Sequence, residues 1–305
     1  MYDLIIIGGG PAAAAAGVYA ARKKIKTFLI AESFGGQSLV SQDIQNWIGT
    51  ISISGLDLAQ AFEAHLRAQQ DIEIQTGELV KTVSQQEKGF NVVMESGKQF
   101  EAKAVLVATG GRRKKVGVPG EKEFDGKGVA YCSICDAPLF GGKDVVVVGG
   151  GNAGLEAVID LLPYANKIYL LQRSGALKGD AVTQERITQD QKVTIIYNAI
   201  TTQILGDTFV RGLVYEDSTT KEAHTLDVQG VFIEIGSLPN SELVKDVVKI
   251  TQYGEIEVDV CGKTSVSGIW AAGDITNLKY KQNNIAAGDA VRAVLSVYDY
   301  LTYNK

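Results

Sequence analysis

The chain is poor in cysteine, has no excess of positive charge and contains no long apolar run. Three cysteines among 305 residues are too few for a secreted fold held together by disulfides. The formal net charge of −5 argues against nucleic acid as the main ligand. The longest apolar runs are far shorter than a membrane span. The N-terminus enters a strand at once, with nothing that resembles a secretion signal. We therefore expect a cytoplasmic protein with no membrane partner.

Glycine, by contrast, is abundant. The 34 glycines accompany 45% hydrophobic and 21% charged residues, a composition typical of a globular protein. The length suits two ordinary domains better than one.

The first glycine cluster resembles a dinucleotide-binding fingerprint. A short apolar strand precedes the pattern Gly8-x-Gly10-x-x-Ala13, and an alanine-rich helix follows. Gly8 permits a tight turn, Gly10 lets the backbone approach a pyrophosphate, and Ala13 allows close helix–strand packing. The helix N-terminus then faces the phosphates. A second strand over residues 27–30 ends at Glu32, 22 residues beyond Gly10, where a carboxylate would bond ribose hydroxyls.

A second fingerprint lies near the middle of the chain. The apolar strand 144–148 leads into Gly149-x-Gly151-x-x-Gly154, a helix to about Leu162 and a further strand. Each fingerprint is followed by short alternating strands and a closing apolar strand with glycine. A repeat of about one hundred residues indicates two copies of one nucleotide-binding fold. The C-terminal segment that contains Asp274 completes the first copy. The predicted fold class is α/β, with two Rossmann-like three-layer (ββα) nucleotide-binding domains, the second inserted into the first.

Two cysteines lie between the fingerprints, in the string Tyr131-Cys132-Ser133-Ile134-Cys135-Asp136. A close dithiol with an acidic neighbour, flanked by two dinucleotide units, indicates an electron relay to a disulfide substrate. The alternative is half of a zinc site, which needs two more ligands. Only Cys261, His65 and His224 remain for that purpose. We expect Cys261 to be a buried strand residue, His65 to pack at the edge of a helix and His224 to lie in a polar strand.

Over its whole length the chain resembles the low-molecular-weight thioredoxin reductases. It is most similar to the reductase portion of the alkyl hydroperoxide reductase flavoprotein subunit. The resemblance rests on residues 21–25 (ARKKI), 34–37 (FGGQ), 118–121 (VPGE), 131–136 (YCSICD), 138–140 (PLF), 271–274 (AAGD) and 280–282 (YKQ). It implies a homodimer with an FAD-binding domain over 1–115 and 240–305. It also implies an NAD(P)H-binding domain over 116–239 that contains the CxxC. Segments 112–119 and 237–241 are the expected hinges, about which the second domain would rotate.

The resemblance also implies roles for individual residues. Cys135 would face the flavin, Cys132 would attack the substrate disulfide, and Asp136 would act as general acid–base. The expected FAD-binding residues are Gly8, Gly10, Pro11, Ala12, Ala13, Glu32, Gly36, Gln37, Asn46, Gly273, Asp274, Lys281, Gln282 and Asn283. The expected NAD(P)H-binding residues are Gly149, Gly151, Asn152, Ala153, Gly154, Arg173 and Lys178. No metal is expected.

The nicotinamide site departs from the family pattern. NADPH-specific members have a His-Arg-Arg run and a later Arg, where this chain has Gln172-Arg173-Ser174 and Lys178. One arginine and one lysine can hold a 2′-phosphate less well than a bidentate cluster. An NADH enzyme would have an acid there, and Gly154 favours NADH by the fingerprint. NADPH is only slightly favoured, and a different electron donor stays open.

The predicted function is reduction of a disulfide in a thioredoxin-like protein by NAD(P)H, FAD and the dithiol in turn. The peroxide-reductase subunit has an extra N-terminal thioredoxin-like region that this sequence lacks, so we expect the acceptor of the dithiol's electrons to be a separate protein or a small molecule. The alternatives are a reductase of a glutaredoxin-like carrier in a peroxiredoxin system, a nicotinamide-independent flavin disulfide reductase, and a flavin-bound redox sensor without turnover.

Overall fold

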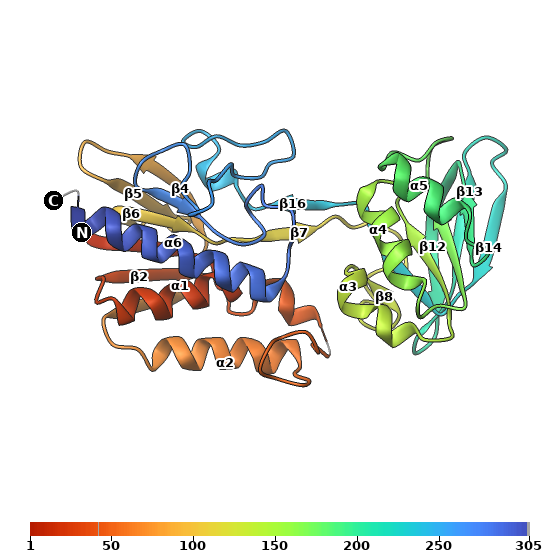
Figure 1. The fold of residues 1–305 in the computed structure, drawn as a ribbon, viewed down its shortest axis with the longest axis horizontal. Helices are drawn as coiled ribbons and strands as arrows, with labels where there is room; N and C mark the ends of the chain where they lie inside the picture. The colour runs from red at the N-terminus through yellow and green to blue at the C-terminus, as the bar shows by residue number, and fades with distance from the viewer. Residues whose placement is uncertain (42, 304–305) are drawn as a thin grey trace. The chain divides into compact units, whose positions relative to one another are not determined.

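The computed structural model describes residues 1–41 and 43–303, which divide into two units (Figure 1). Unit 1 comprises Met1–Arg112 and Leu238–Lys305, and unit 2 comprises Arg113–Ser237. Unit 2 therefore interrupts unit 1 in the sequence. The chain crosses between them at strands β7 (Gly111–Arg113) and β16 (Ser237–Pro239), which pair with each other.

Unit 1 is built on a seven-stranded sheet of order β3-β2-β1-β6-β5-β4, with β17 also paired to β6. Its strands are β1 (Tyr2–Ile7), β2 (Thr27–Ala31), β3 (Ile72–Thr76), β4 (Val80–Gln85), β5 (Phe90–Met94), β6 (Gln99–Val107) and β17 (Ile269–Ala271). Its helices are α1 (Pro11–Arg22), α2 (Gly55–Arg67) and α6 (Asn283–Tyr303), with 3₁₀ turns η1 (Gly36–Val40) and η3 (Glu242–Val244). Strands β1, β2, β3, β6 and β17 are parallel, whereas β4 and β5 are antiparallel to their neighbours.

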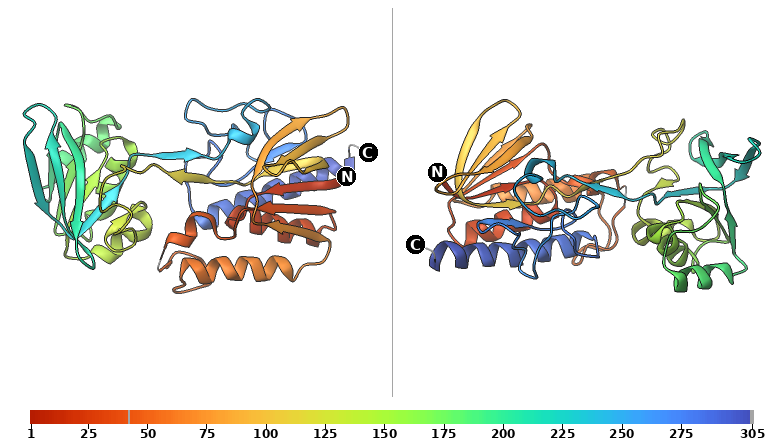
Figure 2. Two further views of the ribbon diagram at one scale, coloured as in Figure 1. Left: turned by 180° about the vertical axis from the view of Figure 1, so that it is seen from behind. Right: turned by 90° about the horizontal axis from the view of Figure 1, so that it is seen from above.

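The pleat of β1 divides the core of unit 1 into two layers. Leu4 and Ile6 pack against α1 and α6, which lie side by side on one face of the sheet (Figures 1 and 2). Ile5 and Ile7 pack on the opposite face, against β4, β5 and the segment after β16. A strand buried on both faces explains why residues 4–7 form a continuous apolar run.

Unit 2 repeats this plan on a five-stranded parallel sheet of order β11-β10-β9-β15-β8 and a three-stranded antiparallel sheet of order β12-β13-β14. Its strands are β8 (Val129–Ala130), β9 (Asp144–Val148), β10 (Lys167–Leu171), β11 (Val193–Ile196), β12 (Ala199–Gly206), β13 (Val210–Asp217), β14 (Ala223–Asp227) and β15 (Gly230–Ile233). Its helices are α3 (Ser133–Asp136), α4 (Asn152–Leu161) and α5 (Ala181–Thr188), with the 3₁₀ turn η2 (Ala137–Phe140).

The strand β9 divides the core of unit 2 in the same way. Val145 and Val147 pack against α4, and Val146 and Val148 pack against β12 and β13. The predicted fold class, two Rossmann-like three-layer units with the second inserted into the first, is confirmed. Which nucleotide each unit binds, and the exact limits of each domain, remain predictions.

The helices differ in how their N-termini are capped. The Ser54 side chain accepts a hydrogen bond from Asp57 N at 3.1 Å and caps α2. The Asp180 side chain caps α5 in the same way. The N-cap residues of α1 and α4 are Gly10 and Gly151, which have no side chain with which to cap. The two fingerprint helices therefore keep their first N–H groups available for an anion.

Two predicted details are wrong. Cys261 is not in a buried strand: it is half-buried in a turn, where Asp259 Oδ1 accepts hydrogen bonds from Cys261 N at 2.8 Å and Lys263 N at 2.9 Å. His65 lies on α2 but is exposed, not packed. His224 lies in the polar strand β14, as predicted.

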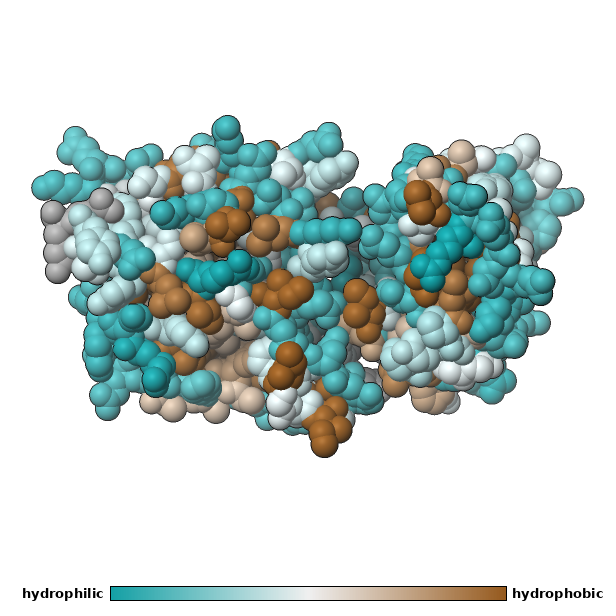
Figure 3. All heavy atoms as spheres, viewed as in Figure 1, coloured by the Kyte–Doolittle hydropathy of each residue, from teal (hydrophilic) through white to brown (hydrophobic). Residues whose placement is uncertain are grey.

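The surface in Figure 3 is mostly polar, and its hydrophobic side chains form small groups separated by hydrophilic ones. Within residues 1–41 and 43–303, no helix combines the length and apolarity needed to cross a membrane.

Candidate active site

The first fingerprint forms a tight turn between β1 and α1. Gly8 has φ +133°, and a Cβ there would lie 2.2 Å from Ala108 O on the neighbouring segment. Only glycine fits this position. A Cβ at Gly10 would meet no atom of the described residues within 4 Å. Open space therefore lies in front of the N-terminus of α1, where Pro11, Ala12 and Ala13 begin the helix.

Three other segments of unit 1 lie beside this turn. Gly35 N donates to Gly9 O at 2.9 Å, and a Cβ at Gly36 would lie 3.4 Å from Gly10 Cα. The end of β17 is equally close, because a Cβ at Gly273 would lie 3.2 Å from the Cβ atoms of Ala12 and Ala286. The predicted residues Glu32, Gly36 and Gln37 are exposed, and Asp274 is half-buried.

The predicted polar residues of unit 1 also lie together. Asn46 Nδ2 donates to Gln282 Oε1 at 3.1 Å. Ser38 Oγ donates to Asn283 Oδ1 at 3.2 Å, and Asn284 Nδ2 donates to Asn46 O at 2.6 Å. The structure therefore joins two segments more than 230 residues apart. Ser38 and Asn284 were not predicted from the sequence because their role depends on this pairing.

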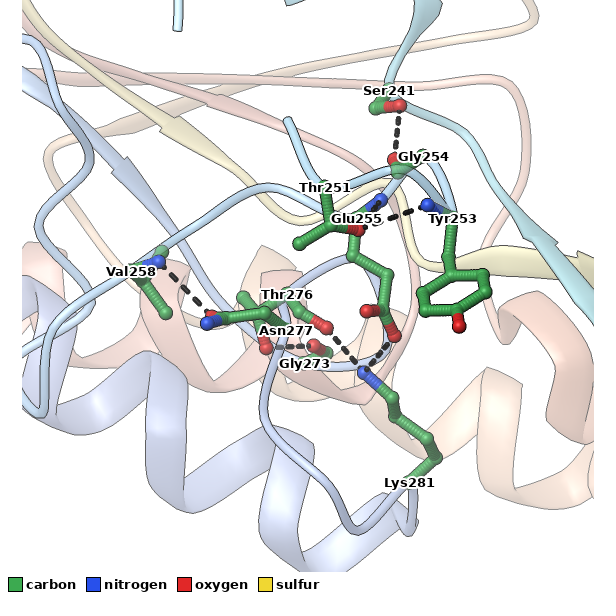
Figure 4. A network of polar contacts seen from close by, with 10 residues as sticks. All are labelled: Ser241, Thr251, Tyr253, Gly254, Glu255, Val258, Gly273, Thr276, Asn277 and Lys281. Carbon is green, nitrogen blue, oxygen red and sulfur yellow. Dashed lines mark hydrogen bonds and ion pairs between the residues drawn. The ribbon is translucent and has the colours of Figure 1, made fainter. Parts of the chain in front are cut away.

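Lys281 lies in the polar network of Figure 4. Its Nζ donates to the Thr276 carbonyl and lies 3.4 Å from Glu255 Oε1. The Thr276 hydroxyl donates in turn to Gly273 O at 2.8 Å. Lys281 thus fixes the loop between β17 and α6, which holds Gly273 next to α1. Its partner Glu255 was not predicted from the sequence.

The residues around this turn of unit 1 are of the kinds that hold a dinucleotide such as FAD. The uncapped N-terminus of α1 and the open space at Gly10 suit a pyrophosphate. Glu32 follows β2 directly, where the fingerprint places the carboxylate that bonds ribose hydroxyls. The amide cluster of Asn46, Gln282 and Asn283 supplies both donors and acceptors.

The second fingerprint has the same plan with a tighter helix–strand contact. A Cβ at Gly151 would meet no described atom within 4 Å, whereas one at Gly154 would lie 1.6 Å from Gly149 O. Gly154 is therefore required by this packing, which is the role that the fingerprint gives to its third glycine. Asn152 Oδ1 accepts from Asp180 N at 2.8 Å, and Ala153 is exposed in the first turn of α4.

Gln172 fixes the loop that follows β10, which is the part of unit 2 expected to distinguish NADPH from NADH. Its Oε1 accepts from Gly150 N at 3.3 Å, and its Nε2 donates to Ala176 O at 2.7 Å and to Ser174 Oγ at 2.8 Å. Gln172 is only 5% exposed. Because its amide is used within the protein, Gln172 is poorly placed to bind a ribose. Arg173 and Lys178 are exposed beside it and fit a 2′-phosphate.

The dithiol is present as a disulfide between Cys132 and Cys135, with their Cα atoms 5.3 Å apart. Cys135 is exposed and Cys132 is half-buried, at the two ends of the first turn of α3. Burial raises the pKa of Asp136, the next residue, to about 6, and the nearby Arg113 guanidinium opposes this shift. Asp136 can therefore both accept and release a proton near neutral pH. Within residues 1–41 and 43–303, no group of three or more His, Cys, Asp or Glu side chains is placed to hold a metal ion.

Two further acids lie near the disulfide, and neither was predicted from the sequence. Ser133, between the cysteines, donates its hydroxyl proton to Asp160 Oδ2 at 2.7 Å. Its backbone N–H donates to the carboxylate of Glu234, which is only 7% exposed. Asp160 lies on α4 and Glu234 follows β15, so no local sequence pattern links either one to the CxxC.

Two dinucleotide-type units, one of which contains a redox-active CxxC disulfide, define a disulfide oxidoreductase. The comparisons with known proteins agree. The family model described as pyridine nucleotide-disulphide oxidoreductase matches residues 2–290. The chain belongs to the pyridine nucleotide-disulphide oxidoreductase family. This confirms the predicted resemblance and the prediction that the protein is an oxidoreductase. The family implies FAD and a reduced pyridine nucleotide as cofactors.

Individual relatives are consistent with this assignment. A Pseudomonas putida protein named as part of alkyl hydroperoxide reductase is 44% identical over 305 residues, which cover 98% of this chain and 58% of that protein. A protein named NADH dehydrogenase from Bacillus subtilis is 43% identical over 99% of this chain and 59% of its own length. The chain therefore spans about three fifths of these relatives. The crystal structure of thioredoxin reductase from Streptococcus pyogenes is 33% identical, with a TM-score of 0.93 and 99% of both chains covered.

Proposed function

We propose that this chain is a thioredoxin reductase-like flavoenzyme. It passes electrons from NAD(P)H, with NADPH slightly preferred, through FAD and the Cys132–Cys135 dithiol to the disulfide of a thioredoxin-like protein. Unit 1 binds FAD, and unit 2 binds the nicotinamide and contains the dithiol. The active form is a homodimer, in the cytoplasm. The observation that supports this proposal best is the accessible disulfide next to a protonatable carboxyl group.

The residues of unit 1 bind and orient the flavin. The N–H groups in the first turn of α1 would bind the pyrophosphate, Glu32 would bind ribose hydroxyls, and the Asn46–Gln282 pair would supply hydrogen bonds to other polar groups of FAD. When bound, FAD supplies the two-electron chemistry that connects a reduced nicotinamide to a disulfide.

The residues of unit 2 carry out the exchange with the partner. Once the disulfide is reduced, the Cys132 thiolate attacks the partner disulfide and forms a mixed disulfide. Cys135 then attacks Cys132 Sγ, which restores the internal disulfide and releases the partner as a dithiol. Asp136 supplies the proton that the departing thiolate takes up and regains it in the next cycle. Segments 112–119 and 237–241 act as hinges between successive steps.

A second partner class is supported by the relatives. Two of them are named for alkyl hydroperoxide reduction or NADH oxidation, which favours a glutaredoxin-like or other thioredoxin-fold carrier in a peroxiredoxin system, with NADH as an alternative donor. A donor other than a nicotinamide is the third possibility.

The test is anaerobic stopped-flow reduction of the FAD-loaded protein with NADPH and NADH in parallel, followed by a thioredoxin or a glutaredoxin-like carrier. We expect rapid flavin reduction by at least one nucleotide and then stoichiometric reduction of one carrier class. Flavin that neither nucleotide reduces at a useful rate would point to another donor. Reduced enzyme that passes electrons to neither carrier would contradict the proposed function.

A further inference from the structure

Glu234 lies directly beside the redox disulfide although it is about one hundred residues away in the sequence. Strands β15 and β8 are parallel, with Val231 paired to Val129 and Phe232 to Ala130. Two residues further along, this register reaches Glu234 and Cys132. Both residues therefore leave the sheet at the same edge, and Glu234 N is fixed there by a 2.9 Å hydrogen bond to Val148 O.

The Glu234 side chain takes the place of a helix cap. The N-cap residue of α3 is Cys132, whose sulfur is used by the disulfide. The Ser133 N–H, at the first position of α3, donates instead to the Glu234 carboxylate. Since Ser133 Oγ also donates to Asp160, both hydrogen-bond donors of Ser133 are bound to acids. These contacts fix the CxxC backbone.

The charged groups around Glu234 are unbalanced. Asp136 on α3 and Asp160 on α4 face it as like charges, and Arg113 on β7 is the facing cation. Burial, followed by the two like charges, raises the pKa of Glu234 to about 7, although Arg113 and the Ser133 N–H favour its ionised form. One guanidinium does not balance three neighbouring carboxylates, and Glu234 is the buried one of the three, so this arrangement favours a proton on Glu234 near neutral pH.

We propose that Glu234 is a positioning residue of the redox dithiol, which holds the Ser133 N–H and takes up a proton when the Cys132–Cys135 disulfide is reduced. Reduction breaks the S–S bond with two electrons. One sulfur takes up a proton to become a thiol, and the other remains a thiolate. The new negative charge increases the proton affinity of the adjacent carboxylate, which binds one proton from solvent and releases it on reoxidation.

This inference deepens the proposed function, because it concerns the same dithiol. Its test does not depend on the carrier or on the nicotinamide. The FAD-loaded protein is equilibrated with dithiothreitol, a dithiol that is oxidised to its own cyclic disulfide as the protein disulfide is reduced. Acid quenching and alkylation then count the protein thiols at a series of pH values. The reduction equilibrium constants of wild type and Glu234→Gln are compared, because glutamine keeps a hydrogen-bond acceptor for Ser133 but cannot titrate.

We expect the two proteins to agree within about 1.5-fold near pH 5.5, where Glu234 is protonated in both redox states. Near pH 8.5 the reduction equilibrium constant of the glutamine variant is at least about threefold larger than that of wild type. This corresponds to a difference in reduction potential of roughly 14 mV, at 29.6 mV per tenfold change in the constant. A rise of about half a pKa unit on reduction is enough for this effect. Glu234→Asp keeps the carboxyl group and should keep the pH dependence. The exposed Glu185→Gln on α5 is the matched control and should match wild type throughout.

If the reduction equilibrium constants of Glu234→Gln and wild type differ by the same factor at every pH, the role of Glu234 is purely structural and the proposal is overturned. Equal constants at every pH would also overturn it. If Glu234→Gln does not fold, ¹³C NMR of labelled glutamates in wild type decides: one glutamate must titrate at higher pH in the reduced state. If no glutamate does, the proposal is wrong. A disulfide that dithiothreitol cannot open at any pH would instead contradict the proposed function.

Discussion

Two of the three fingerprint glycines of unit 2, Gly151 and Gly154, have different roles, one in binding and one in stability, and alanine substitutions distinguish them. At Gly151 an added Cβ enters open space in front of α4. We expect Gly151→Ala to change the free energy of unfolding by less than about 1 kcal/mol. The same methyl group would displace a pyrophosphate from the N–H groups of α4. One lost charge-assisted hydrogen bond costs about 1.5–3 kcal/mol, so the nicotinamide dinucleotide should bind roughly 10- to 150-fold more weakly.

Gly154→Ala is the matched control, because its Cβ would lie 1.6 Å from Gly149 O and the backbone must move. We expect it to destabilise unit 2 by about 1–3 kcal/mol. Calorimetric titration with NADP⁺ and NAD⁺ measures binding, and denaturant unfolding measures stability. FAD content should stay unchanged in Gly151→Ala, since the proposed FAD site lies in unit 1. The reasoning is refuted if Gly151→Ala binds both dinucleotides as well as wild type does, or if it loses as much stability as Gly154→Ala.

The other predictions concern the dithiol, its acid and the donor loop. After reduction, Cys135→Ser should form a stable mixed disulfide with its carrier and Cys132→Ser should not, and non-reducing electrophoresis measures both. A mixed disulfide formed by Cys132→Ser alone would mean that Cys135, and not Cys132, attacks the carrier. Arg173→Ala and Lys178→Ala should each weaken NADPH binding about fivefold, because an exposed ion pair contributes about 1 kcal/mol. NADH binding should stay unchanged. Equal losses of affinity for both nucleotides would exclude 2′-phosphate recognition by these two residues. Because the pKa of Asp136 is raised to about 6 in the folded protein, its contribution favours folding at low pH and is lost as pH rises from about 4 through about 6. The difference in unfolding free energy between Asp136→Asn and wild type should therefore shift in favour of the variant by about 1–2 kcal/mol between about pH 4 and about pH 8, after allowance for solvent screening. Urea unfolding at both pH values measures this difference, and a difference that does not change with pH would contradict the prediction.

Local patterns were enough to predict the fold and the position of the disulfide. The turns at Gly8 and Gly149 could be predicted because each lies within a strand–glycine–helix pattern, and the CxxC is a contiguous motif. The 1.6 Å approach to Gly149 O gives the structural reason for glycine at position 154, and the choice between NADH and NADPH stays a prediction.

The details that could not be predicted depend on pairing between distant segments or on competing turn chemistry. Glu234 reaches the dithiol only because β15 pairs with β8, and nothing near residue 234 in the sequence indicates this. The alternating run that ends at Cys261 favoured a strand, but the Asp259 side chain binds the backbone two and four residues ahead and forms a turn.

The central claim is that the Cys132–Cys135 disulfide receives the electrons that enter from a reduced nicotinamide. The most direct measurement is an anaerobic titration of the FAD-loaded protein with NADPH, in which flavin absorbance and alkylatable thiols are followed together. The account predicts two new thiols per chain, assigned by mass spectrometry to Cys132 and Cys135, before the flavin stays reduced. Full flavin reduction with the disulfide still closed would contradict it.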